Sequence, residues 1–243
     1  MIVKTRGICL HTRKYAETSV IARVYTEELG LQSYIISGVR TRKPKVHASL
    51  LQPMSVLDMV VYHHPNRESL FRTKEIRSAH NFERIPFELQ RSSVCLFAAE
   101  VLLKALQVSE APPELFAFVI DFLLYVDHTD DPVANLPPYF LARMTEFLGF
   151  QPELPEFGGP YYFDRTQGYF LPEAPDHDLY TDVEASALLL ALMQADLSEV
   201  HAIESDRVSR ATVVTTLLNY LRGHMERFKG ITSHRVLSEV LRA

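Results

Sequence analysis

Residues 7–45, GICLHTRKYAETSVIARVYTEELGLQSYIISGVRTRKPK, decide the fold of the front of this 243-residue chain. Short runs of β-branched and aromatic residues alternate here with the glycines and charged turns that end strands. The same pattern continues to residue 77. It predicts five strands, at residues 2–10, 20–26, 31–39, 55–62 and 69–77, and so many strands in so short a segment favour a small closed barrel.

From residue 86 onward the apolar residues change to helical spacing. Helices are predicted at residues 87–107, 115–126, 138–148, 183–193, 209–228 and 233–241. Thr181 with Glu184 predicts a capping box before the fourth. The predicted fold class is α+β: an OB-fold barrel over residues 1–80, with an SH3-like barrel as the alternative, and a helical domain over residues 81–243, joined near residues 79–86.

Residues 151–175 interrupt the helical spacing with five prolines and three glycines. Two aromatic runs, at residues 161–163 and 169–171, flank a polar turn and predict a hairpin. We expect a small knuckle inserted between helices.

Cys9 and Cys95 are the two cysteines of the chain, and both lie among apolar neighbours. They are expected to be buried thiols in a reducing compartment. No apolar run reaches the length of a signal core or a membrane span. The expected location is therefore cytoplasmic, with no membrane partner.

Charge is divided unevenly along the chain. Residues 1–80 carry 13 Lys and Arg against 6 Asp and Glu, whereas residues 81–243 carry 12 against 24. A basic module of net +7 at the front of a mildly acidic protein indicates a surface that binds a polyanion.

Two basic elements in the predicted barrel are the expected DNA-binding residues. One is a loop between strands, and the other ends the first strand, with Tyr15 or Tyr34 as a stacking surface for a base. The predicted DNA-binding residues are Arg13, Lys14, Tyr15, Arg40, Arg42, Lys43 and Lys45. The plain alternatives are a solvated basic loop and tyrosines that belong to the core.

A further basic patch lies near the C-terminus, where residues 201–243 have net charge +3. It is predicted to bind a partner or a second stretch of DNA, although cations at helix ends also complement the helix dipole. Its residues are Arg222, His224, Arg227, Lys229 and Arg235.

Signals for an enzyme are poor. The sequence has no phosphate-binding glycine loop, no His-Glu-x-x-His and no nucleophile elbow, and its short Asp and His clusters lack metal-site spacing. No catalytic residue, metal or cofactor is expected.

Several motifs together resemble the RecO family of bacterial recombination mediators. They follow in the order of that family over essentially the whole chain: GICL (residues 7–10), YAETS (15–19), YTEELGL (25–31), SGVR (37–40), LLQPMS (50–55), LGFQPEL (148–154) and KGITSHRVL (229–237). Many relatives place four cysteines in the knuckle as a zinc site, but residues 151–175 contain none. Zinc is therefore not expected here.

The resemblance implies a non-enzymatic protein that binds single- and double-stranded DNA and anneals complementary strands. It also implies a role in loading RecA onto strands coated by single-stranded DNA-binding protein, with RecR and the acidic tail of that protein as partners. The alternative is a protein-interaction adaptor whose basic barrel is incidental. A metal-dependent nuclease is a more distant possibility.

Overall fold

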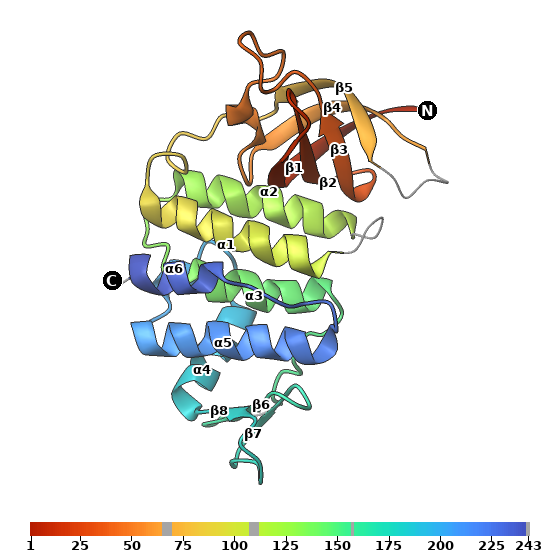
Figure 1. Ribbon diagram of the computed structural model, residues 1–243. Coiled ribbons are helices and arrows are strands. Elements are labelled where there is room, and N and C mark those ends of the chain that lie inside the picture. The colour runs from red at the N-terminus through yellow and green to blue at the C-terminus, as the bar shows by residue number, and fades with distance from the viewer. Residues whose placement is uncertain (65–69, 107–111, 157, 242–243) are drawn as a thin grey trace. The chain divides into compact units, whose positions relative to one another are not determined.

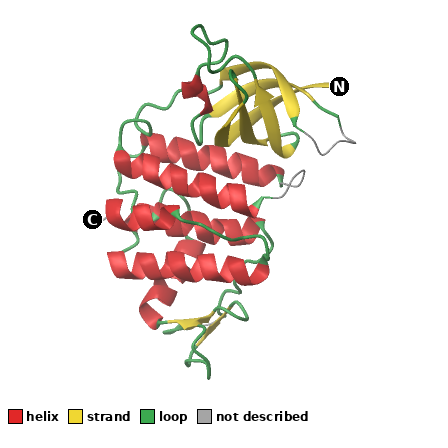
Figure 2. Ribbon diagram, in the orientation of Figure 1, coloured by secondary structure: helices red, strands yellow, loops and turns green. Residues whose placement is uncertain are grey.

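The computed structural model describes residues 1–64, 70–106, 112–156 and 158–241. The chain forms two compact units, which are described separately below. The barrel unit contains Met1–Arg84 and Leu106–Asp127, and the helical unit contains Ile85–Ala105 and His128–Ala243. Figure 2 shows the barrel strands of the first unit, and the helices of the second together with its small separate sheet.

The barrel unit contains five strands that close into a barrel of order β1-β2-β3-β5-β4, in which β3 and β5 alone run parallel. They are β1 (Ile2–Tyr15), β2 (Ser19–Thr26), β3 (Gly30–Ile36), β4 (Val56–Tyr62) and β5 (Phe71–Ser78). The OB-fold prediction is confirmed. Strand ends differ from expectation, most of all in β1, which continues to Tyr15 rather than residue 10, and in β3, which ends at Ile36 rather than residue 39. Ser69, the predicted start of the fifth strand, lies outside the described residues.

Strand β1 is long because it pairs with both of its neighbours along its length, with β4 over its first half and with β2 over its second. It changes direction where the two pairings overlap. At Gly7 an added Cβ would lie 2.6 Å from Val24 and 2.9 Å from Met59, so only glycine fits there. A register shift between Cys9 and His11 follows. Gly7 and this shift together let β1 pair with β4 along one half and with β2 along the other.

Alternation along the strands separates a core from an outer face. On β2, Val20, Ala22 and Val24 belong to the buried core of the barrel, and Arg23 points to the other side. Part of the outer face is covered by α2 (Pro113–His128), most of which belongs to this unit. Phe116 of α2 packs edge-on against Tyr25 of β2, with 5.4 Å between ring centroids.

The helical unit is built on α3, which packs against α1, α4 and α5, while α6 lies on α1 (Figure 1). Its helices are α1 (Leu89–Ala105), α3 (Leu136–Phe147), α4 (Val183–Gln194), α5 (Arg207–His224) and α6 (Ser233–Val240). All the predicted helices are present, with ends shifted by a few residues. Gln107, the predicted end of the first, lies outside the described residues. Short 3-10 helices occur at Ala48–Leu51 in the barrel unit and Val200–Ala202 here.

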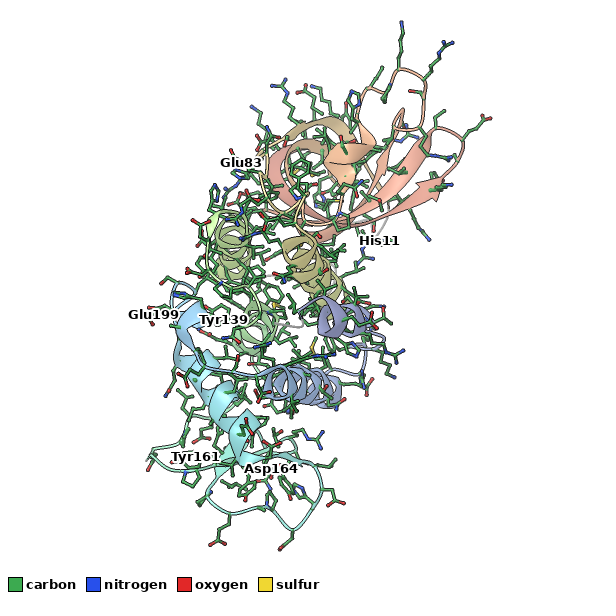
Figure 3. All side chains as sticks on the ribbon, turned by 90° about the vertical axis from the view of Figure 1, so that its left-hand side faces the viewer. His11, Glu83, Tyr139, Tyr161, Asp164 and Glu199 are labelled. Carbon is green, nitrogen blue, oxygen red and sulfur yellow. The ribbon has the colours of Figure 1, made fainter. Side chains whose placement is uncertain are left out.

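The knuckle contains the predicted hairpin, formed by β6 (Tyr162–Asp164) and β7 (Tyr169–Leu171). A third strand that the sequence pattern did not predict, β8 (Tyr180–Thr181), pairs with β6. Asp164, labelled in Figure 3, is buried and accepts hydrogen bonds from the Thr166 backbone and hydroxyl. This buried carboxylate fixes the turn between β6 and β7.

The predicted capping box at Thr181 is wrong by one residue. The N-cap of α4 is Asp182, whose carboxylate accepts the backbone N–H of Ala185. Thr181 instead ends β8, where its hydroxyl lies 2.9 Å from that of Thr216 on α5. The threonine therefore fastens the knuckle to α5.

Candidate nucleic-acid interface

The structure brings the two basic elements of the barrel together. Arg13, Lys14 and Tyr15 are the last residues of β1, and the turn after them is hydrogen-bonded to the loop that follows β3. The backbone N–H of Arg40 donates to the carbonyl of Thr18 at 3.1 Å, and the Arg40 guanidinium reaches the carbonyl of Glu17 at 3.5 Å. Residues 13–15 and 40–45 therefore form one surface, which we call the loop surface.

The loop that carries Arg40, Arg42, Lys43 and Lys45 is closed at its base. Gly38 has a φ of +74°, a conformation that suits glycine, and its carbonyl accepts the backbone N–H of Lys45 at 3.3 Å. The chain thus returns to its starting point within eight residues. The intervening cations project from a compact loop.

The cations of the loop surface are exposed, and among the described residues none of them forms an ion pair. Arg6 on β1 differs from them. Its guanidinium donates two hydrogen bonds to Glu27, at 2.7 and 2.9 Å, and lies 5.5 Å from the ring centroid of Phe116. The charge of Arg6 is already compensated, whereas that of the loop surface is available to an anion.

The two tyrosines considered for base stacking have different surroundings. Tyr15 is 44% exposed at the end of β1, beside Arg13 and Lys14. Tyr34 is fully buried in the barrel core, and burial raises the pKa of its phenol well above the usual range. Tyr34 cannot reach a base, so Tyr15 is the aromatic that the loop surface offers.

Strand β5 adds two exposed cations, Arg72 and Lys74, that were not predicted from the sequence. They were missed although they lie only two residues apart in the sequence. Their neighbours come from other strands, and the register that places them is set by the closed barrel.

The predicted C-terminal patch surrounds the end of α5. Arg222 lies in its last turn, Arg227 and Lys229 are exposed in the segment that follows, and Arg235 is exposed on α6. Helices α5 and α6 are in contact, and burial together with the positive charges of Arg235 and Arg222 lowers the pKa of His234 on α6. His224 has a packing contact as well, because its ring lies 5.0 Å from Phe150 and 4.4 Å from Tyr220.

Over the described ranges, no three His, Cys, Asp or Glu side chains lie together as a metal site. Cys9 and Cys95 are both buried thiols, as predicted, and burial raises the pKa of Cys9 to about 12. Such a thiol is a poor nucleophile at neutral pH. Within the same ranges, no helix has the length and apolar character needed to cross a membrane.

Comparison with known proteins assigns both parts of the chain. Family models described as Recombination protein O N terminal and Recombination protein O C terminal match residues 1–82 and 86–231. A DNA repair protein RecO of Bacteroides fragilis is 33% identical over 241 residues, which cover 99% of each chain. DNA repair proteins RecO of Phocaeicola vulgatus and Porphyromonas gingivalis are each 31% identical, over 99% and 98% of both chains.

Proposed function

The chain belongs to the RecO family, and we propose that it is a non-enzymatic mediator of recombinational DNA repair that binds single- and double-stranded DNA and anneals complementary strands. One observation carries the proposal: the uncompensated cations of the loop surface lie together at one end of an OB-fold barrel. Lys and Arg gain affinity for DNA by releasing the counterions condensed on its phosphates. Such contacts read the backbone, so sequence preference should be weak.

Annealing follows from the same charges. Two strands held near one basic surface meet at a raised effective concentration and with reduced mutual repulsion. Nothing in this step consumes ATP or needs a metal ion. The proposed roles of residues 1–80 and 81–243 are DNA binding and partner binding; the two family models meet between residues 82 and 86, which supports that division.

We further propose RecR and the acidic tail of single-stranded DNA-binding protein as partners, with RecA loading as the indirect result. The helical unit offers exposed apolar side chains next to α1 and on it: Phe87 is 84%, Leu89 68% and Leu96 49% exposed. An acidic, hydrophobic tail needs both an apolar surface and a cation for its terminal carboxylate. The proposed cations are those of the patch at Arg222 and Arg235. The proposed location is the cytoplasm, at the nucleoid.

The test is annealing of complementary oligonucleotides by the purified full chain, without ATP and with EDTA present. The rate should rise above the spontaneous value and fall steeply as salt increases. Tight binding of single strands with an unchanged annealing rate, over a range of protein and salt concentrations, would contradict the mediator role. The adaptor role, which the exposed side chains of α1 favour, predicts that filters retain no oligonucleotide at all.

A further inference from the structure

Strand register links the loop surface to a distant part of the barrel. Reading across neighbouring strands, Arg13 of β1 lies opposite Ile21 of β2, which lies opposite Ile35 of β3. Ile35 is paired in turn with Arg72 of β5, and Arg72 with Tyr62 of β4. These five residues form one continuous row around the barrel.

The row faces outward, because the residues next to it in sequence point inward; Arg13, Arg72 and Tyr62 are exposed, Ile35 is half-buried and Ile21 is buried between its neighbours. Val20, Phe71 and Val61 are members of the buried core, and side chains alternate along each strand. Four steps between neighbouring strands, at about 4.8 Å each, place the two ends of the row roughly 19 Å apart along the surface. That length suits a short stretch of single-stranded DNA, since one OB-fold covers about 4–16 nucleotides.

Each end of the row has an exposed tyrosine beside cations. Tyr15, two residues beyond Arg13, is 44% exposed, and Tyr62 is 42% exposed directly opposite the exposed Arg72. Lys74 lies at the irregularity in the pairing of β4 with β5 and is also exposed. Among the described residues, neither Arg72 nor Lys74 forms an ion pair.

Arg23 supplies a cation in the middle. It belongs to the adjacent outward row, between His11 of β1 and Ser33 of β3 (His11 is labelled in Figure 3). Its Nε is buried and has no hydrogen-bond partner among the described residues, and burial lowers the pKa of its guanidinium. Arg23 is half-buried, so it adds positive charge beneath the middle of the row.

Elsewhere on the outer face of the barrel, positive charge is compensated by acidic side chains or aromatic rings are covered by α2. At the far end of β5, Arg77 lies 3.6 Å from Glu75 and opposite Asp58 of β4. On β2, the ring of Tyr25 is covered by Phe116 of α2. The row between the two tyrosines is therefore where positive charge and accessible aromatic rings coincide.

We propose that one single strand of DNA crosses the barrel along this row, with bases stacked on Tyr15 and Tyr62 at its two ends and phosphates bound by Arg72 and Lys74 as well as by the loop surface. The proposal rests on the DNA-binding function above and extends its site by residues that no local sequence motif marks. The path ends at Tyr62, before the end of β5 at which Arg77 lies beside Glu75 and opposite Asp58.

The experiment compares two arginines of the same strand in the full chain. Arg72→Ala should weaken binding of an oligo-dT of about 16 nucleotides and make the slope of log affinity against log salt less negative by about 0.7, the value for one phosphate contact. Arg77→Ala removes the same charge but should leave both quantities unchanged. Equal effects of the two substitutions would overturn the path.

A second measurement isolates stacking. A 2-aminopurine placed near one end of the oligonucleotide should lose fluorescence on binding, and Tyr62→Ala should abolish that quenching and cost about 5- to 150-fold in affinity. Tyr62→Phe keeps the ring and should restore both. Quenching that is retained in Tyr62→Ala at every probe position would overturn the assignment of Tyr62.

The two proposals fail in distinguishable ways. If neutralising the loop surface abolishes DNA binding while Arg72→Ala and Tyr62→Ala do not alter it, the function stands and the path across the row is wrong. If none of these variants changes affinity or salt dependence, DNA binding by the barrel is itself wrong.

Discussion

Removing three charges from the loop surface should change the salt dependence of DNA binding by a predictable amount. The change is Arg40→Ala, Arg42→Ala and Lys43→Ala in one variant, because these exposed cations lie in the closed loop between Gly38 and Lys45. Binding of single strands releases about 0.7 counterions per phosphate contacted. With about five contacts made by the loop surface, these contacts alone should contribute about −3.5 to the slope of log affinity against log salt.

The triple variant keeps about two of those contacts, so the contribution of its loop surface should be about −1.4. Between 50 and 200 mM salt, the loop-surface contacts should cost the wild type a factor of about 130 in affinity, and the variant a factor of about 7. The assay is fluorescence anisotropy of a labelled oligonucleotide titrated at several salt concentrations, repeated with unrelated sequences. Circular dichroism must first show that the variant is folded.

A matched control removes three positive charges elsewhere: Arg77→Ala, Lys104→Ala and Arg207→Ala, all at exposed positions outside the proposed interface. Its net charge equals that of the loop variant. If long-range charge alone governs binding, both variants should flatten the slope equally. A folded loop variant with wild-type affinity and slope would refute the placement of the site on this loop.

Three further predictions concern other parts of the chain. Elemental analysis of purified protein should find no stoichiometric zinc, and one zinc per chain would refute the reading of the knuckle as packed without metal. Gly168→Ala should lower the free energy of unfolding by about 1–3 kcal/mol more than Gly230→Ala, since both glycines have positive φ but only an added Cβ at Gly168 would lie 2.6 Å from the Tyr220 hydroxyl; equal losses in denaturant titrations would contradict this. Burial alone would raise the pKa of Glu100, but hydrogen bonds from residues 232 and 233 outweigh it and lower the pKa. The contact of Glu100 with the start of α6 is therefore fully present above the ordinary carboxyl pKa, and it is lost as pH falls through the pKa of the folded state. The protection factors of the amides in residues 233–240, which are corrected for the intrinsic exchange rate at each pH, should then fall at acid pH, and in Glu100→Ala already at neutral pH; protection factors that do not depend on pH would be the contrary result.

The sequence predicts the strands and helices well because each has a clear period and clear breaks. It misses the end of β1, since Arg13 and Lys14 resemble a turn when they are read locally, although they pair with Ile21 and Val20 of β2. It also misses β8, where two residues become a strand only because β6 is beside them. In both cases pairing with a distant segment decides the structure, and no local propensity records it.

The same limit applies to the interface. The loop surface is visible in the sequence because its charges are neighbours in the chain, so clustering alone marks them. Tyr34 was a reasonable stacking candidate by type, but β-strand alternation turns it into the core. Arg72 and Tyr62 are candidates that the sequence did not indicate, because only the pairing of β4 with β5 places them side by side.

A closed barrel explains why these dispersed residues act together. In an open sheet, β1 and β5 would be separated by the intervening strands and could present unrelated surfaces. Arg13 lies three strands from Arg72 through β2 and β3, and closure adds a second connection, in which Ile2, at the other end of β1, lies opposite Tyr62. The long, bent β1 thus contributes to both ends of the same outward row, and the bend depends on Gly7. A larger residue there would displace β1 against β2 and β4, so the position that closes the barrel also aligns the cations proposed to bind DNA.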